Sequence, residues 1–358
     1  MSKLKVAVIF GGVSSEHEVS LVSATHIIQN IPKDKYEVVC IGITKKGRWL
    51  YFPGDVKLIA TGEWDKHPDC VPAVLSPDPI HHGFIKFSGG GCSVQKVDVI
   101  FPALHGKNGE DGTIQGLFEL AAIPYVGCGV LSSADCMDKE ITHTILDANG
   151  IRTAKFCTVH RSDLSHLNKR CEEIAEKLGF PLFVKPANCG SSVGINKAHT
   201  IEDLSDAIKY AFTHDKKVIV EEFIKGKEIE CAVFGNDTPI ASIPGEIVPS
   251  KEFYDYEDKY ILGSTQLFIP ARIEDKYSDK IRETAVAAYK ALGCSGLTRV
   301  DFFFTDKNEI VLNEPNTLPG FTPISMYPKL MAATGMPYSE LIDNLIKLAC
   351  EKAEINVE

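Results

Sequence analysis

The stretch Lys5-Val6-Ala7-Val8-Ile9-Phe10-Gly11-Gly12 decides the class of fold. Apolar residues that suit a buried strand run into a pair of glycines, and a helix-like segment begins near Glu18. Two more apolar stretches, at 38–43 and 97–101, are typical of further strands. The succession of strand, glycine turn, helix and strand indicates a parallel sheet with helices on its faces. We therefore expect an α/β fold, in which residues 50–96 form connections and an edge hairpin.

The rest of the chain continues this mixed pattern. Residues 136–149 suit one helix that ends at Gly150. Thr200 and Asp203 have the spacing of a capping box, which predicts a helix start. We expect further strands at 181–186, 218–224, 229–235, 298–304 and 309–313, and a helix at 278–292.

Length and composition narrow the class of protein. A chain of 358 residues is longer than one core usually supports, so we expect two or three domains. A net charge of −10 provides no general attraction for nucleic acid or an anionic membrane, and we expect neither as a partner. No run approaches the roughly 18 apolar residues of a membrane span. The 11 cysteines include no C-x-x-C pair, which argues against a disulfide framework or a zinc site and favours a cytoplasmic protein.

The strongest chemical signal is the strand pair that ends in Asn316. Side chains alternate along a strand, so Arg299 and Asp301 share one face, and Glu314 and Asn316 are expected to share the face of Leu312. Folding the strands back places Asp301 across from Glu314. Burying two carboxylates together is costly unless a cation offsets them, and this oxygen set suits Mg²⁺. A salt bridge from Arg299 to one acid, with the other exposed, is the alternative.

A second set of residues suits a nucleotide. Lys185 ends a strand before the loop 187–194, whose glycines and serines could bind phosphate oxygens through backbone and hydroxyl groups. The lysine precedes the glycines, so this is not a Walker A loop. The strand end at 221–224 and Glu228 could contact a purine and a ribose. A plain turn and a solvated acidic strand end are the respective alternatives.

Three other segments could contribute to a site. Glu16 follows the first glycine turn, where it could hold a substrate ammonium or act as an ordinary acid at a helix N-terminus. The polar turn that starts at His105 lies at the edge of a sheet where ligands of α/β proteins collect. The run 253–260 could be a lid that closes with Lys259, or an aromatic cover over the core.

Together these segments resemble the D-alanine–D-alanine ligase family of the ATP-grasp superfamily, over nearly the whole chain. The matching motifs are Gly11-Gly12-x-Ser14-x-Glu16-x-Glu18-Val19-Ser20, His105-Gly106-x-x-Gly109-Glu110-Asp111-Gly112, Met137-Asp138-Lys139, Gly190-Ser191-Ser192-x-Gly194, Phe253-x-Asp255-Tyr256-x-x-Lys259-Tyr260, Arg299-Val300-Asp301 and Asn313-Glu314-x-Asn316-Thr317-x-Pro319-Gly320.

The resemblance implies an ATP-grasp architecture in three parts. These are an N-terminal α/β substrate domain at 1–126, a central domain at 127–222 and a C-terminal catalytic domain at 223–358, with ATP between the last two. The family also leads us to expect a homodimer.

The resemblance assigns roles to individual residues. The nucleotide set comprises Lys139 and Lys185 for the phosphates, Lys259 on the lid, Glu221, Phe223 and Ile224 for adenine, and Glu228 for ribose. Asp301, Glu314 and Asn316 would bind two Mg²⁺ (or Mn²⁺) ions. Activation by K⁺ is left open. Glu16 would hold the first D-alanine near His105. Ser191 and Tyr260 would order the lid. Arg299 and the N–H of Gly320 would bind the oxyanion, and Ser325 would bind the carboxylate of the second D-alanine.

The implied reaction joins two D-alanines through a D-alanyl phosphate, for peptidoglycan synthesis. Two positions bear on the second substrate: D-serine-using relatives often carry Arg where this chain has Met326, and D-lactate-using relatives tend to have His in place of Tyr260. D-alanine is therefore favoured, with D-serine or D-lactate as alternatives. Many relatives also have Glu where this chain has Cys189. Another ATP-grasp enzyme would lack the Glu16 turn, and a non-catalytic regulator would lack part of the carboxylate set.

Overall fold

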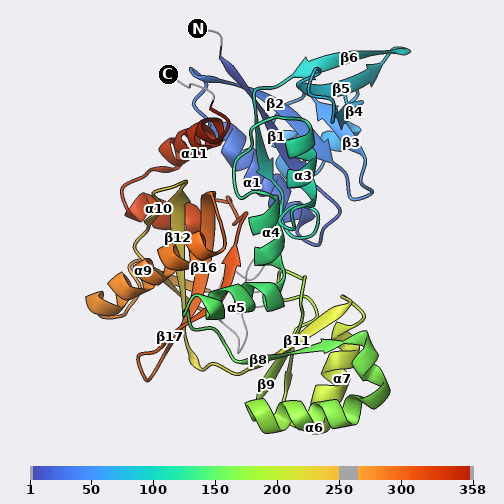
Figure 1. Ribbon diagram of the computed structural model, residues 1–358. Coiled ribbons are helices and arrows are strands. Elements are labelled where there is room, and N and C mark those ends of the chain that lie inside the picture. The colour runs from blue at the N-terminus through green and yellow to red at the C-terminus, as the bar shows by residue number, and fades with distance from the viewer. Residues whose placement is uncertain (1–2, 250–264, 355–358) are drawn as a thin grey trace.

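The computed structural model describes residues 3–249 and 265–354. Three sheets follow one another along the chain, and Figure 1 shows the N-terminal sheet at one end of the molecule and the central sheet at the other. The fold class is confirmed as α/β, with one sheet containing parallel strands and two antiparallel sheets.

The first sheet has seven strands in the order β6-β5-β4-β3-β2-β1-β7. Strand β1 (Leu4–Gly11) lies parallel to β2 (Tyr36–Ile43) and β7 (Val99–Ala103), as the glycine-turn pattern predicts. Helix α1 (His17–Asn30) follows the turn, and α3 (Thr113–Leu120) follows β7.

The region 50–96 is more regular than predicted. Its strands β5 (Gly83–Ser88) and β6 (Gly91–Lys96) form the expected edge hairpin. However, β3 (Trp49–Phe52) and β4 (Val71–Leu75) also pair antiparallel and extend the sheet. The short helices α2 (Lys57–Ala60) and η1 (Trp64–Lys66) lie between them. Strands this short, joined by irregular loops, give too little periodicity to be recognised from sequence.

The second sheet is antiparallel, with the order β10-β9-β11-β8. Helices α6 (Leu167–Leu178) and α7 (Ile201–Ala211) pack together on it (Figure 1). The predicted capping box forms, because Asp203 N donates to Thr200 Oγ1 and Thr200 N donates to the Asp203 carboxylate, both at 3.1 Å. The remaining elements are β8 (Phe156–His160), η2 (Arg161–His166), β9 (Leu182–Pro186), β10 (Asn196–Ala198) and β11 (Lys217–Glu222).

The helix predicted at 136–149 is in fact two helices. Helix α4 (Val130–Met137) ends before Asp138, and α5 (Lys139–Ala148) begins directly after it. Asp138 has an extended backbone, and its side chain accepts a hydrogen bond from Ile141 N. An aspartate that caps a helix in this way ends the preceding one, which periodicity alone does not reveal.

The third sheet has the order β15-β14-β12-β16-β17, and β13 pairs with β12. Its long central strands are β12 (Gly226–Gly235) and β16 (Gly296–Thr305). Around them lie β13 (Ile240–Ala241), β14 (Gly245–Val248), β15 (Gln266–Phe268), α9 (Asp275–Ala291), β17 (Ile310–Asn316), α10 (Met326–Ala333) and α11 (Tyr338–Lys352).

Two buried clusters join the parts of the chain. One brings Phe10 and Phe101 of the first sheet together with Tyr327 and Leu345 of α10 and α11. Another brings Cys136 of α4 together with Phe302 of β16. Each sheet falls inside one of the predicted segments, while the boundaries at 126 and 222 stay a prediction. Among the helices of the described ranges, none combines the length and apolar character needed to cross a bilayer.

Candidate active site

The site is built on the antiparallel pair β16 and β17. Asp301 lies opposite Glu314 and Arg299 lies opposite Asn316, as the turn-back of the chain predicts. A β-bulge follows: Phe302 lies opposite Leu312, so Asn313 is the extra residue. Leu312 therefore packs with Phe302 in the core, and the prediction that it shares a face with Glu314 is wrong. The alternation of side chains between the two faces of a strand breaks wherever a β-bulge inserts an extra residue.

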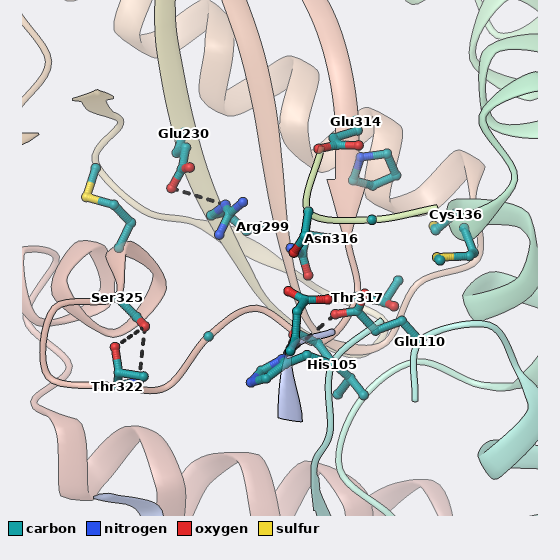
Figure 2. A pocket seen from close by; sticks show the side chains of 18 of the residues that line it. His105, Glu110, Cys136, Glu230, Arg299, Glu314, Asn316, Thr317, Thr322 and Ser325 are labelled. Atoms are coloured by element: carbon teal, nitrogen blue, oxygen red, sulfur yellow. Dashed lines mark hydrogen bonds and ion pairs between the residues drawn. The ribbon is translucent and has the colours of Figure 1, made fainter. Parts of the chain in front are cut away.

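Basic side chains offset the negative charges of Asp301 and Glu314. Arg299 makes a bidentate pair with Asp301, with Nε to Oδ1 at 2.8 Å and Nη2 to Oδ2 at 2.7 Å. Lys139 Nζ lies 3.4 Å from Glu314 Oε2. Figure 2 also shows an acid that the sequence analysis missed: Glu230, whose Oε2 lies 3.1 Å from Arg299 Nε. Since Glu230 follows Glu228 by two residues on β12, strand alternation could have found it.

The residues present fit a divalent cation that prefers oxygen. The Oδ1 atom of Asn316 is buried and accepts no hydrogen bond from any residue in the described part of the chain. A buried amide oxygen in that state is costly unless a ligand satisfies it. Asp301 and Glu314 supply carboxylate oxygens in adjacent positions. Within the described residues no group of three or more His, Cys, Asp or Glu side chains could hold a metal by itself, so phosphate or water oxygens would complete the coordination.

Two adjoining cavities lie along this surface. One, of about 460 Å³, is lined by the predicted nucleotide residues Lys185, Glu221, Phe223, Ile224 and Glu228, and by Asp301. The other, of about 270 Å³, is lined by Glu16, His105, Arg299, Asn316, Gly320, Ser325 and Met326. Five residues line both cavities: Lys139, Gly190, Ser191, Glu230 and Glu314. The predicted residues thus separate into a nucleotide set and a substrate set on either side of a shared wall.

A buried ion pair forms the floor of the larger cavity. Lys185 Nζ lies 2.6 Å from Glu221 Oε2, and His143 Nε2 lies 3.2 Å from Glu221 Oε1. Burial opposes both charges, but the Glu221 carboxylate raises the pKa of Lys185, and Lys185 and His143 lower the pKa of Glu221. Lys185 therefore stays cationic. His143 was not predicted, and nothing in its helical segment distinguishes it from an ordinary helix residue.

Glu16 lines the smaller cavity beside Gly106, where an added Cβ would lie 2.7 Å from Glu16 Oε2. Glu16 is buried at the start of α1, near His105. His105 Nδ1 donates to the carbonyl of Leu318 at 3.0 Å, which leaves Nε2 to accept from the Ser23 hydroxyl at 3.1 Å. Burial lowers the pKa of His105, so a neutral ring is favoured. Burial, with the nearby charge of Glu16, raises the pKa of Glu110, a cavity residue to which no role was assigned.

The opposite wall is the turn before α10. The Ser325 hydroxyl accepts from Thr322 N at 3.0 Å and lies 2.7 Å from Thr322 Oγ1 (Figure 2). A Cβ on Gly320 would lie 2.7 Å from Ser325 Oγ, so only glycine fits there without a shift. Lys259 and Tyr260, the predicted lid residues, lie outside the described residues.

Comparison with known proteins agrees with this geometry. Residues 5–128 match the family described as D-ala D-ala ligase N-terminus, and residues 145–347 match D-ala D-ala ligase C-terminus. The chain is 51% identical to a D-alanine–D-alanine ligase of Caldicellulosiruptor bescii, covering 98% of this chain and 96% of the relative. It is 52% identical to a D-alanine–D-alanine ligase of Thermoanaerobacter pseudethanolicus, covering 98% of each.

Two solved structures that resemble this chain are also ligases of this kind. The VanG D-Ala:D-Ser ligase from Enterococcus faecalis has a TM-score of 0.90 and 46% identity, covering 97% of this chain and 100% of the other. The D-alanine–D-alanine ligase from Coxiella burnetii has a TM-score of 0.85 and 36% identity, covering 98% and 96%. Fold and site together define an ATP-grasp enzyme, an ATP-dependent ligase that uses a divalent metal. The chain belongs to the D-alanine–D-alanine ligase family.

Proposed function

We propose that this chain joins two D-alanines into D-Ala-D-Ala for peptidoglycan synthesis, with release of ADP and phosphate. The observation that carries the proposal is the pair of adjoining cavities with a shared wall of Lys139, Ser191 and Glu314. A nucleotide in the larger cavity would present its γ-phosphate at that wall. A small amino acid in the smaller cavity would present its carboxylate to the same point, which is the arrangement that forming an acyl phosphate requires.

Each side chain then has a defined task. Lys139 and Lys185 bind the phosphates, and Glu16 orients the ammonium of the first D-alanine. Arg299 and the N–H of Gly320 stabilise the oxyanion that forms when the second amine attacks the D-alanyl phosphate. A divalent cation bound by Asp301, Glu314 and Asn316 would offset the negative charge of the phosphates. Buried walls protect the acyl phosphate from water.

The test is phosphate release from ATP and Mg²⁺ with D-alanine alone, and then with D-serine or D-lactate in competition, with products resolved by mass. We expect D-Ala-D-Ala to dominate. A dominant mixed product would keep the ligase chemistry but change the second substrate. No phosphate release dependent on a D-amino acid would refute the proposed function.

The similarity to a D-Ala:D-Ser ligase makes D-serine the second candidate as acceptor. Met326 favours D-alanine, because its buried, apolar side chain lines the smaller cavity near Ser325 and offers no donor to a substrate hydroxyl. We expect Met326→Arg to raise the yield of D-Ala-D-Ser relative to D-Ala-D-Ala in the mass assay. An unchanged product ratio would show that Met326 does not select the substrate.

The number and kind of metal ions complete the proposal. We propose two Mg²⁺ or Mn²⁺ ions, which equilibrium dialysis of the ADP complex would count. Assays in K⁺ and in Na⁺ buffers would show whether K⁺ activates. We also propose a homodimer in the cytoplasm, where ATP is available, and light scattering would give the mass of the assembly.

A further inference from the structure

Three acidic side chains lie in a row across the C-terminal sheet. Glu230 of β12 and Glu314 of β17 each lie opposite Asp301 of β16 in the strand register. Residues directly opposite each other have Cβ atoms about 5 Å apart, so three unbalanced carboxylates would repel one another. Among the described residues, Lys139 and Arg299 offset these charges. Lys139 lies against Glu314 at one end, and Arg299 lies against Asp301 and Glu230 at the other.

Arg299 is bound from two strands. Asp301 on its own strand takes both Nε and Nη2, while Oε2 of Glu230 on the neighbouring strand lies 3.1 Å from Nε. The side chains of Arg299, Asp301 and Glu230 are 15%, 15% and 7% exposed, so their charges are poorly screened by water. The position of the guanidinium therefore depends on both acids.

Asp301 has two tasks that compete. It is the partner of Arg299, and it is also a predicted ligand of the divalent cation. One carboxylate charge shared by a guanidinium and a divalent cation holds each of them less firmly than it would hold one alone. Glu230 lies on the side of Asp301 away from Glu314, and it adds a second negative charge for Arg299.

We propose that Glu230 is a positioning residue that keeps Arg299 in place on the wall of the smaller cavity and so leaves Asp301 available to the divalent cation. The inference rests on the proposed ligase activity, in which Arg299 faces the oxyanion. Glu230 acts through Arg299. Without the charge of Glu230, Arg299 depends more on Asp301 and competes with the metal for its carboxylate.

The experiment is a titration of the ADP complex with Mn²⁺, followed by electron paramagnetic resonance, in the wild-type chain and in Glu230→Gln. We expect Glu230→Gln to weaken Mn²⁺ binding several-fold and to lower kcat, with little change in the KM for the first D-alanine. Glu230→Asp, which keeps the charge on a shorter side chain, should fall between the two chains and also serves if Glu230→Gln does not fold. Unchanged Mn²⁺ affinity in both variants would overturn the inference.

Glu246 provides a matched control. It is a buried acid on the adjacent strand β14 and makes a similar pair with Arg272, at 3.0 Å to Nε and 2.7 Å to Nη2, but it lines neither cavity. Glu246→Gln should lower the thermal midpoint while leaving Mn²⁺ affinity and kcat unchanged. A loss of Mn²⁺ affinity equal to that of Glu230→Gln would show a general effect of losing a buried carboxylate.

A double-mutant cycle separates positioning from a direct effect of the Glu230 charge on the metal. In an Arg299→Met background, Glu230→Gln should change Mn²⁺ affinity by no more than about two-fold, because the residue it acts through is gone. Equal weakening in both backgrounds would make Glu230 part of the metal's own charge environment and overturn the positioning role. These titrations need no turnover, so their outcome is independent of which dipeptide the wild-type chain makes.

Discussion

At residue 106 the backbone has a φ of +69° and passes beside the carboxylate of Glu16. A Cβ at this position would lie 2.7 Å from Glu16 Oε2 and 3.0 Å from Ser14 Oγ. Glycine is therefore needed for two reasons, the left-handed backbone and the close approach of the side chain expected to hold the first substrate.

We expect Gly106→Ala to fold but to displace Glu16. The left-handed conformation costs alanine about 1–2 kcal/mol in stability. If displacement loses about 1.4 kcal/mol of substrate binding, the KM for the first D-alanine rises about tenfold. Steady-state kinetics and a denaturant titration measure the two effects. The control is Gly116→Ala in α3, where nothing lies within 4 Å of the added Cβ, and which should stabilise the helix without a change in KM.

At position 106 the size of the side chain matters, whereas at Glu314 the site needs the negative charge. We expect Glu314→Gln to keep the fold, since the amide has nearly the same shape, but to lower kcat by at least about 100-fold through loss of charge at the metal and phosphates. Circular dichroism with the phosphate-release assay checks both statements. Near-normal turnover would exclude Glu314 as a metal ligand.

The break between α4 and α5 shows how an element end positions a functional group. Asp138 caps α5 through Ile141 N, and its carboxylate lies 2.7 Å from Lys217 Nζ. Lys139, the first residue of α5, directs its ammonium to the Cys189 carbonyl at 3.0 Å, beside the glycine-serine loop. The cap thus fixes the point from which Lys139 reaches both cavities.

We expect Asp138→Ala to cost about 1 kcal/mol in stability through loss of the cap, with a further cost from loss of its ion pair with Lys217, and to raise the KM for ATP by shifting Lys139. The control is Thr200→Ala, which removes the cap of α7 at a residue that lines neither cavity. It should cost about 1 kcal/mol in the free energy of unfolding, the contribution of a cap alone, without changing the KM. If both variants leave the KM for ATP unchanged, the cap has no part in positioning Lys139.

Sequence alone predicts the elements whose signals are local. The glycine turn at Gly11 and Gly12 gives the parallel strands, and the spacing of Asp301 and Glu314 gives their pairing. It misses the bulge at Asn313, because the bulge depends on pairing with another strand, and the break at Asp138, because periodicity does not reveal a capping residue inside a helical pattern. Resemblance to a family supplies roles for residues, but contacts such as His143 with Glu221 come only from the folded structure.

At the scale of the whole molecule, residues far apart in sequence share one core and one charge cluster. Helix α11 packs on α1 and β7, so the C-terminal part of the chain completes the N-terminal core (Figure 1). Asp343 of α11 lies at this contact, 2.8 Å from Lys35 Nζ, 2.7 Å from Tyr36 Oη and 2.7 Å from Lys347 Nζ. The sequence analysis predicts no helix at 338–352, and an amphipathic pattern would not say which distant sheet such a helix covers.

The pKa of Asp343 makes this contact testable by pH. Burial alone would raise it, but hydrogen bonds from Lys347, Lys35 and Tyr36 hold it below its ordinary value. A carboxyl whose pKa is lowered in the folded state contributes stability above its unfolded pKa, about 4, and loses that contribution as the pH falls through the folded value. We therefore expect Asp343→Asn to destabilise the chain by about 2 kcal/mol at neutral pH.

The difference in unfolding free energy between the two chains should stay constant from neutral pH to about pH 5. It should shrink below about pH 4, where Asp343 takes up a proton in the unfolded wild-type chain before it does so in the folded chain. Urea titrations at each pH measure it. Asp206→Asn is the control, because Asp206 pairs with Lys209 at an exposed position where such pairs contribute little. A difference that stayed constant well below pH 4 would mean that Asp343 stabilises α11 by shape and not by charge.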